Sequence, residues 1–304
     1  MQSRSNRVRA LKMVRIIAVL FLAASMYFWY ESQSNGHALT DLAAQDLICG
    51  DVIAPCQVGN RSYNILVPQG EGPFPAVIFF HGSGGSGASV IRDAALVAPL
   101  LQKGYALIAP SALDVTYSGG RRLSGWIWEG QRDGRDDYRF VQDVINDATS
   151  KFPIQEEDLI VAGHSNGATF VWYLACEGLD TRLRNFATIG GTPVRDRLLS
   201  CADVRPSFNL YHTHGTADSV VPVDGTQRTA TWHGWLGAIE AVEMMAAASG
   251  CSEKEEIATS ETTETTRWYG CQSGAEFRVD LNDGGHEIPT NWVETLFAWS
   301  QDLP

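Results

Sequence analysis

Short apolar runs alternate with longer amphipathic segments along most of this chain. The runs expected to form strands cover residues 62–67, 76–80, 105–109, 159–162, 186–189, 208–211 and 276–279. The segments expected to form helices cover residues 88–103, 136–151, 168–177, 235–248 and 291–301. A continuous apolar run such as 76–80 is typical of a strand buried on both faces. Strands that alternate with helices predict an α/β fold, in which helices cover both faces of a mainly parallel sheet.

The first thirty residues follow a different pattern. Five basic residues and no acidic residue precede the apolar run 16–30. The basic residues are Arg4, Arg7, Arg9, Lys12 and Arg15. The run is shorter than the ~20 residues of a membrane span and is typical of a signal peptide. Ala23-Ala24-Ser25 offers a cleavage site, whereas the aromatic residues 27–30 favour an anchor at a membrane interface. We therefore interpret residues 1–30 as an export signal, either cleaved or retained as an anchor.

Beyond this leader, the composition predicts one acidic domain. Residues 31–46 are polar and are interpreted as a flexible segment, and no Pro- or Ser-rich linker divides residues 47–304. When the five basic residues of the leader are left out, 18 basic and 35 acidic residues remain, which gives a net charge of −17. Such a charge argues against binding to nucleic acid or to an anionic membrane surface.

All six cysteines follow the leader. In an exported chain an even number of cysteines suggests disulfides, and six cysteines permit fifteen pairings. The simplest set joins nearest neighbours: Cys49–Cys56, Cys176–Cys201 and Cys251–Cys271. No group of Cys and His has the spacing of a zinc site, so we expect neither a metal nor another cofactor.

The chain around residue 165 carries the strongest chemical signal. The apolar run 159–162 leads into Gly163-His164-Ser165-Asn166-Gly167, which fits G-x-S-x-G, the strand-to-helix turn that exposes a nucleophilic serine. The glycines let strand and helix approach closely, and the helix N-terminus favours a developing negative charge. Such a pentapeptide also occurs in plain tight turns, but between a strand and a helix it predicts Ser165 as a nucleophile.

A glycine-rich loop, residues 81–87, directly follows the apolar run 76–80. It lacks the lysine and the hydroxyl residue of a phosphate-binding P-loop, so an oxyanion loop is the better interpretation. A tetrahedral acyl intermediate needs backbone N–H groups directed at its oxygen, and glycine lets the backbone come close. The predicted donors are Ser83 or Gly84 in this loop and Asn166 in the turn.

A serine nucleophile needs a base that is held by an acid, and in hydrolases with this turn the chain order is Ser, acid, His. Asp218 follows the expected strand 208–211, and His286 follows the expected strand 276–279. Both therefore lie on loops at the rim that also carries Ser165. The rival acids are Asp224 and Asp283, and the rival bases are His212 and His214. Both rival bases precede Asp218, which is the wrong order, and we expect His214 to stabilise its turn.

The irregular segment 111–134 contains two tryptophans, Trp126 and Trp128. Long ordered loops often contribute to binding sites, so both indoles are candidates for stacking on a substrate. Packing of the loop against the body of the protein is the equally weighted alternative.

Several motifs together resemble the polyhydroxybutyrate depolymerase and feruloyl esterase family of secreted α/β-hydrolases. They are His81-Gly82, Gly163-His164-Ser165-Asn166-Gly167-Ala168, His214-Gly215-x-x-Asp218-x-x-Val221-Pro222, Gly285-His286-x-x-Pro289, Arg135-Asp136-Asp137-x-x-Phe140 and Trp268-x-x-Cys271. The likeness spans roughly residues 55 to 290. It implies an α/β-hydrolase fold and hydrolysis of carboxylic esters, with Ser165 as nucleophile, His286 as base and Asp218 as orienting acid.

We therefore expect an exported serine esterase that acts on small or oligomeric esters. Two features depart from the family pattern: no polymer-binding domain follows the catalytic body, and His164 stands where many relatives carry an apolar residue. The first departure favours soluble esters over solid polyester. Acyl transfer to an alcohol and a catalytically silent binding protein of the same fold are the alternatives, and the residues do not identify the acyl or alcohol group.

Overall fold

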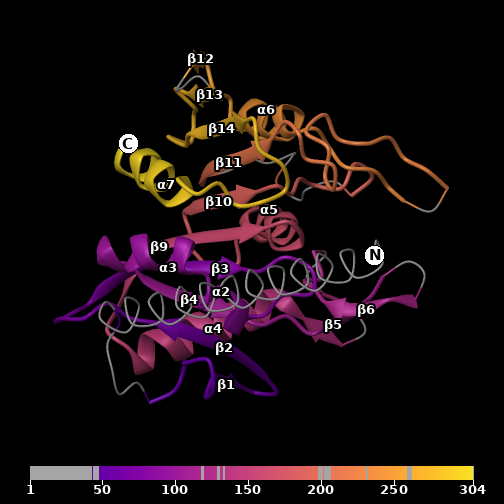
Figure 1. Cartoon of the computed structure of the whole chain (residues 1–304). Helices are drawn as coiled ribbons and strands as arrows, with labels where there is room; N and C mark the ends of the chain where they lie inside the picture. The colour runs from indigo at the N-terminus through magenta and orange to yellow at the C-terminus, as the bar shows by residue number, and fades with distance from the viewer. Residues whose placement is uncertain are drawn as a thin grey trace, which may run out of the picture.

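A computed structural model describes residues 43, 48–117, 120–128, 131–132, 134–197, 201, 207–230, 232–258 and 262–303. The expected leader, 1–30, lies outside these residues, as does nearly all of the segment 31–46. The main sheet of the described residues has ten strands in the order β1-β2-β4-β3-β9-β10-β11-β14-β13-β12 (Figure 1). In chain order these strands are β1 (Cys56–Val58), β2 (Arg61–Leu66), β3 (Phe74–Phe80), β4 (Ala106–Pro110), β9 (Ile154–His164), β10 (Asn185–Ile189), β11 (Asn209–Gly215), β12 (Glu253–Ala258), β13 (Thr263–Tyr269) and β14 (Phe277–Asn282).

The centre of the sheet is parallel and its edges are antiparallel. Strands β4, β3, β9, β10, β11 and β14 pair in parallel, while β1 and β2 on one side and β13 and β12 on the other pair antiparallel. The carboxyl ends of β3, β9, β10, β11 and β14 therefore meet along one rim, where ligands bind in open α/β sheets. Two hairpins, β5 (Asp114–Thr116) with β6 (Arg122–Ser124) and β7 (Gln131–Arg132) with β8 (Arg135–Asp136), belong to the connection after β4.

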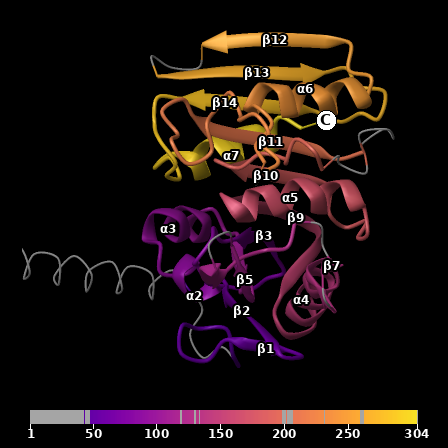
Figure 2. The same ribbon diagram turned by 90° about the vertical axis from the view of Figure 1, so that its right-hand side faces the viewer.

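Helices cover both faces of this sheet, as the alternating pattern predicted. One face packs against α4 (Asp137–Lys151), α5 (Asn166–Glu177) and α6 (Ala238–Ala248). The other face packs against α2 (Gly87–Val90), α3 (Ala94–Gln102) and α7 (Trp292–Gln301). Figure 2 shows the strands stacked from β1 to β12, with α4, α5 and α6 on one side and α3 and α7 on the other. Neighbours along β3 alternate between the two cores, with Ile78 in one and Phe79 in the other.

Two predicted elements differ from the structure for local reasons. The expected helix 88–103 is split into α2 and α3, because the Asp93 carboxylate accepts hydrogen bonds from the N–H groups of Ala95 and Leu96 and starts a new helix there. Strands β12 and β13 were not predicted, because their sequences are rich in Glu and Thr and show no apolar run. They extend the sheet at its edge, where one face of a strand is exposed to solvent.

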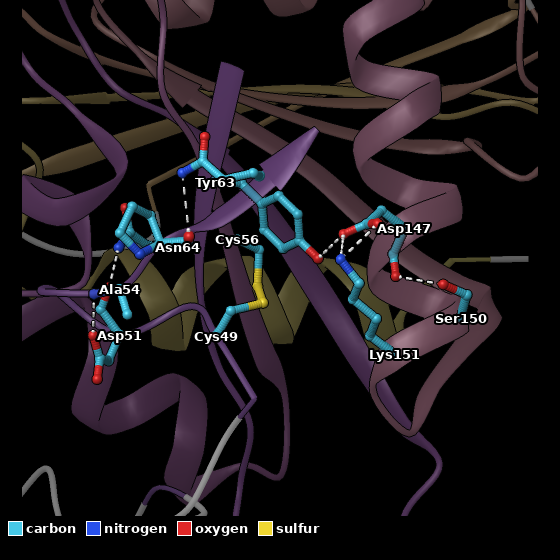
Figure 3. Close-up of a disulfide and its surroundings, with 11 residues drawn as sticks. Cys49, Asp51, Ala54, Cys56, Tyr63, Asn64, Asp147, Ser150 and Lys151 are labelled. Carbon is cyan, nitrogen blue, oxygen red and sulfur yellow. Dashed lines mark hydrogen bonds and ion pairs between the residues drawn. A yellow bond between two sulfur atoms is a disulfide. The ribbon is translucent and has the colours of Figure 1, made fainter. Parts of the chain in front are cut away.

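The structure contains all three predicted disulfides. Cys49–Cys56 joins the segment before β1 to β1 itself, close to Tyr63 of β2 (Figure 3). The Tyr63 hydroxyl donates to the Asp147 carboxylate over 2.8 Å and thereby links β2 to α4. Within the described residues, no helix combines the length and apolar character that a membrane span requires.

Candidate active site

The predicted serine turn is present between β9 and α5. Ser165 has φ 56° and ψ −121°, and it is the one non-glycine residue with positive φ in the described part of the chain. A Cβ atom at Gly167 would lie 2.1 Å from the Phe80 carbonyl oxygen, so only glycine permits α5 to start this close to β3. The backbone of Ser165 is strained in the way that characterises a nucleophile elbow.

Hydrogen bonds join the three residues that the sequence predicted as a triad. His286 Nε2 lies 2.9 Å from Ser165 Oγ, and His286 Nδ1 lies 2.7 Å from Asp218 Oδ2. Ser165 follows β9, Asp218 follows β11 and His286 follows β14, so the parallel register brings together residues up to 121 positions apart. The rivals Asp224 and Asp283 are not the partners of His286, because Asp218 occupies its Nδ1.

The Asp218 carboxylate is buried and fully engaged. Its Oδ1 accepts the N–H groups of Val220 and Val221 at 2.8 and 2.9 Å, while Oδ2 faces His286. Burial by itself raises the pKa of Asp218, but the hydrogen bonds from His286, Val221 and Val220 outweigh it and leave the pKa below its ordinary value. Asp218 is therefore ionised at neutral pH and can stabilise a proton on His286.

The glycine-rich loop lies against the serine, but only part of the oxyanion prediction fits it. A Cβ atom at Gly82 would lie 3.2 Å from that of Ser165, which shows how closely the loop approaches. The N–H of Gly84 already donates to the Ser124 carbonyl oxygen at 2.8 Å, so the Gly84 prediction was wrong. The N–H groups of Ser83 and of Asn166, at the first turn of α5, remain as the candidate donors.

His81, at the start of this loop, is buried and shapes it. Its Nδ1 donates to the Gly82 carbonyl oxygen at 2.7 Å, and its Nε2 accepts from the Ala112 N–H at 3.0 Å. Burial lowers the pKa of His81 to about 4. The neutral ring therefore ties the loop to the segment after β4.

Sequence reasoning missed the contact that His164 makes. Its Nε2 lies 2.5 Å from the backbone carbonyl oxygen of His286. A carbonyl oxygen only accepts, so Nε2 carries the proton, and burial lowers the pKa of His164 and keeps the ring neutral. The sequence showed only that an imidazole replaces the apolar residue common before such a serine.

The structure also corrects the assignment of the two tryptophans. Trp126 is only 2% exposed; it packs against Phe80 and Phe170, and its Nε1 donates to the His81 carbonyl oxygen. Trp128 is half-buried and packs against Tyr173. Neither indole lines the cavity at Ser165. Both indoles pack the loop against the body of the protein, which is the alternative interpretation.

A cavity of about 490 Å³ opens beside Ser165 and His286, between the glycine-rich loop and α2 and α3. Its apolar lining comes from Phe79, Val90, Leu96, Val220 and Ile288. Asp93 is the one carboxylate among the lining residues, which include no lysine or arginine. The cavity therefore suits an uncharged, largely apolar group next to the serine hydroxyl.

Comparisons with known proteins agree with this architecture. Residues 75–208 match the alpha/beta hydrolase fold family. No curated protein sequence matches the chain. Among solved structures, the chain is similar to an S-formylglutathione hydrolase from Agrobacterium tumefaciens, with a TM-score of 0.57, 12% identity, 82% of this chain covered and 94% of the other.

Two further structures are similar to a comparable degree. The acetyl xylan esterase from Aspergillus awamori has a TM-score of 0.52 and 17% identity over 77% of this chain and 94% of its own. The esterase PE8 has a TM-score of 0.51 and 18% identity over 80% of this chain and 99% of its own. Sheet order, serine turn and these likenesses together show that the chain has the alpha/beta hydrolase fold.

Proposed function

We propose that this protein is an exported serine esterase that hydrolyses carboxylic esters. The observation that carries the proposal is the continuous hydrogen-bonded line from Ser165 through His286 to a buried carboxylate, Asp218. A buried carboxylate and an imidazole beside a strained serine are what acyl transfer to serine requires. The similar structures named above are two esterases and a hydrolase, which agrees with this chemistry.

The geometry supports a two-step reaction. Ser165 Oγ attacks the ester carbonyl carbon while His286 Nε2 takes the hydroxyl proton, and Asp218 stabilises the resulting imidazolium. The N–H groups of Ser83 and Asn166 stabilise the oxyanion, and the alcohol leaves with the proton from His286. Water then attacks the acyl-enzyme with His286 again as base, which releases the acid and restores Ser165.

The cavity beside Ser165 supports a soluble ester with an uncharged acyl or aryl group as substrate. Its volume of about 490 Å³ is sufficient for a small or oligomeric ester, and Asp93 disfavours an anionic group there. On its sequence motifs, we propose that the protein belongs to the polyhydroxybutyrate depolymerase and feruloyl esterase family. Export is supported by the basic, apolar leader and by the three disulfides, which form in oxidising compartments.

Fluorophosphonate labelling together with turnover of nitrophenyl esters tests the proposal. Wild-type protein should be labelled at Ser165 and should hydrolyse nitrophenyl butyrate, whereas Ser165→Ala and His286→Ala should each lose at least about 10³-fold in turnover. A control is Ser150→Ala, an exposed serine of α4 whose hydroxyl donates to the Asp147 carbonyl oxygen in the same helix. A silent binding protein would be neither labelled nor active, and an acyltransferase would release less free acid when an alcohol is added.

A further inference from the structure

Two histidines on β11 form a buried line of hydrogen bonds that the reaction itself does not use. Thr188 Oγ1 of β10 lies 2.8 Å from His212 Nδ1, and His212 Nε2 lies 3.0 Å from His214 Nδ1. His214 Nε2 in turn lies 2.8 Å from the Val221 carbonyl oxygen. All three side chains are at most 1% exposed, and Trp172 of α5 covers His212. Burying three polar side chains in a row is costly unless every bond is made.

The last acceptor in this line sets the direction of every bond. A carbonyl oxygen only accepts, so His214 Nε2 must carry a proton. Burial lowers the pKa of both His214 and His212, so each ring is neutral and carries one proton. His214 Nδ1 therefore accepts from His212 Nε2, and His212 Nδ1 accepts from the Thr188 hydroxyl. The four groups form one line that runs from Thr188 to Val221.

The end of this line touches the residues that hold Asp218. The Val221 carbonyl oxygen accepts a hydrogen bond from His214 Nε2, and the Val221 N–H donates to Asp218 Oδ1 at 2.9 Å. His214 Nε2 also lies 3.5 Å from Asp218 Oδ2, the oxygen that faces His286. The charged or titratable groups near the line are thus Asp218 and His286, both at its Val221 end.

We propose that His214, supported by His212 and Thr188, is a positioning residue that holds Asp218 in line with His286. The inference rests on the proposed esterase function. Asp218 sits in a short turn after β11, and backbone N–H groups fix only one of its two oxygens. By holding Val221, the His214 ring fixes the turn itself, so the second oxygen stays directed at His286. Because each hydrogen bond in the line has one donor and one acceptor, the bonds from His212 and to Val221 together fix the orientation of the His214 ring.

Four variants separate this role from a general contribution to packing. His214→Phe fills the space of the ring but donates nothing, while His214→Gln retains an N–H donor near the position of Nε2. Thr188→Val removes the far hydroxyl and keeps the shape of the side chain. The matched control is Thr213→Val, a buried threonine between the two histidines whose side chain points to the opposite face of β11.

The readouts are steady-state kinetics on nitrophenyl butyrate and the far-downfield proton resonance of the His286 Nδ1–H. We expect His214→Phe to lower kcat by about 10- to 100-fold with little change in KM, since one buried donor is lost. The downfield resonance should broaden or shift in the same variant. His214→Gln should recover most of kcat, Thr188→Val should lose a few-fold, and Thr213→Val should match wild type.

The His286 resonance reports the geometry of the Asp218–His286 pair independently of ester turnover. Wild-type protein that turns over no ester but shows the resonance, with loss in His214→Phe alone, would refute the proposed function and retain the positioning role. Overturning the positioning role requires only that folded His214→Phe keeps wild-type kcat and an unchanged resonance. Equal losses in Thr188→Val and Thr213→Val would point to packing and would also overturn it.

Discussion

The side chain before the proposed nucleophile holds the loop that carries the proposed base. His164 Nε2 donates to the backbone carbonyl oxygen of His286 at 2.5 Å, and the two rings lie 5.0 Å apart. The end of β9 thus fixes both the Ser165 turn and, across the rim, the residue that must reach its hydroxyl.

Replacing His164 by Phe should lower kcat by about tenfold, because one buried hydrogen bond to the His286 backbone is lost. His164→Gln keeps a donor on a side chain of similar reach and should recover most of the activity. Turnover of nitrophenyl acetate and a thermal melt of each variant check this. Unchanged kcat in a folded His164→Phe protein would contradict the role given to the contact.

Asp218→Asn should leave the fold intact and reduce turnover by about 10²- to 10⁴-fold, since the amide favours the wrong His286 tautomer. Asp224→Asn is the matched control, because Asp224 lies in the same connection without contacting His286. Steady-state rates on a nitrophenyl ester decide between them. If Asp224→Asn has the large effect and Asp218→Asn does not, the acid has been misassigned.

The charge at the cavity beside Ser165 should set acyl selectivity. We expect Asp93→Asn to raise kcat/KM for an anionic hemisuccinate ester by a few-fold relative to the neutral butyrate ester of the same alcohol. The asparagine side chain can still cap α3, so the helix is retained. The preference of the wild-type protein for the neutral ester should weaken as salt is added, because the cavity is open to solvent and salt screens the charge of Asp93. Asp114→Asn removes an exposed carboxylate on β5 and should leave the ratio of the two kcat/KM values unchanged. If it changes that ratio as much as Asp93→Asn does, the effect is not local to the cavity.

The buried ion pairs that Asp137 forms with Arg61 and Arg135 should contribute strongly to the folding stability of the protein. Arg61 Nη1 lies 2.5 Å from Asp137 Oδ1, Arg135 binds the same carboxylate, and Asp137 is fully buried. Asp137→Asn leaves buried guanidinium groups without their counter-charge and should cost about 3–5 kcal/mol of unfolding free energy. Asp143→Asn removes only an exposed pair with Arg139 and should cost at most about 0.5 kcal/mol. Urea unfolding of both variants tests the contrast, and equal losses would contradict it.

The buried ring of His81 should make folding stability depend on pH. Its pKa is lowered to about 4 in the folded protein by burial, while the unfolded chain takes up the proton near the ordinary value. Between these two pKa values the unfolded state binds more protons, so stability falls as the pH drops through this window. His81→Asn should be less stable at neutral pH and should lose less stability between pH 6.5 and 4, which urea titrations at several pH values measure. An unchanged slope would show that His81 does not titrate as inferred.

Several features were decided by the sequence alone, because each depends on neighbours along the chain. Apolar runs at 76–80 and 159–162 mark buried strands wherever they lie in a sheet. The Ser165 turn follows from two glycines that remove the steric barrier to a tight strand–helix junction. Ser165, Asp218 and His286 each follow a parallel strand, so their loops emerge on one rim. Their order along the chain ranks His286 above His212 and His214, which precede Asp218.

Tertiary structure decided which groups were already satisfied and which faced a cavity. Gly84 is lost as an oxyanion donor because the β5–β6 hairpin returns to place the Ser124 carbonyl oxygen on its N–H. Trp126 is lost as a substrate contact because the same segment turns its indole against Phe170. His164 donates to the carbonyl oxygen of His286, 122 residues away, through a loop path that no local pattern encodes. His214 bonds to the carbonyl oxygen of Val221 in its own turn, as the sequence predicted. Periodicity reports whether a side chain is buried, but its hydrogen-bond partner depends on strand order and on where each loop crosses the rim.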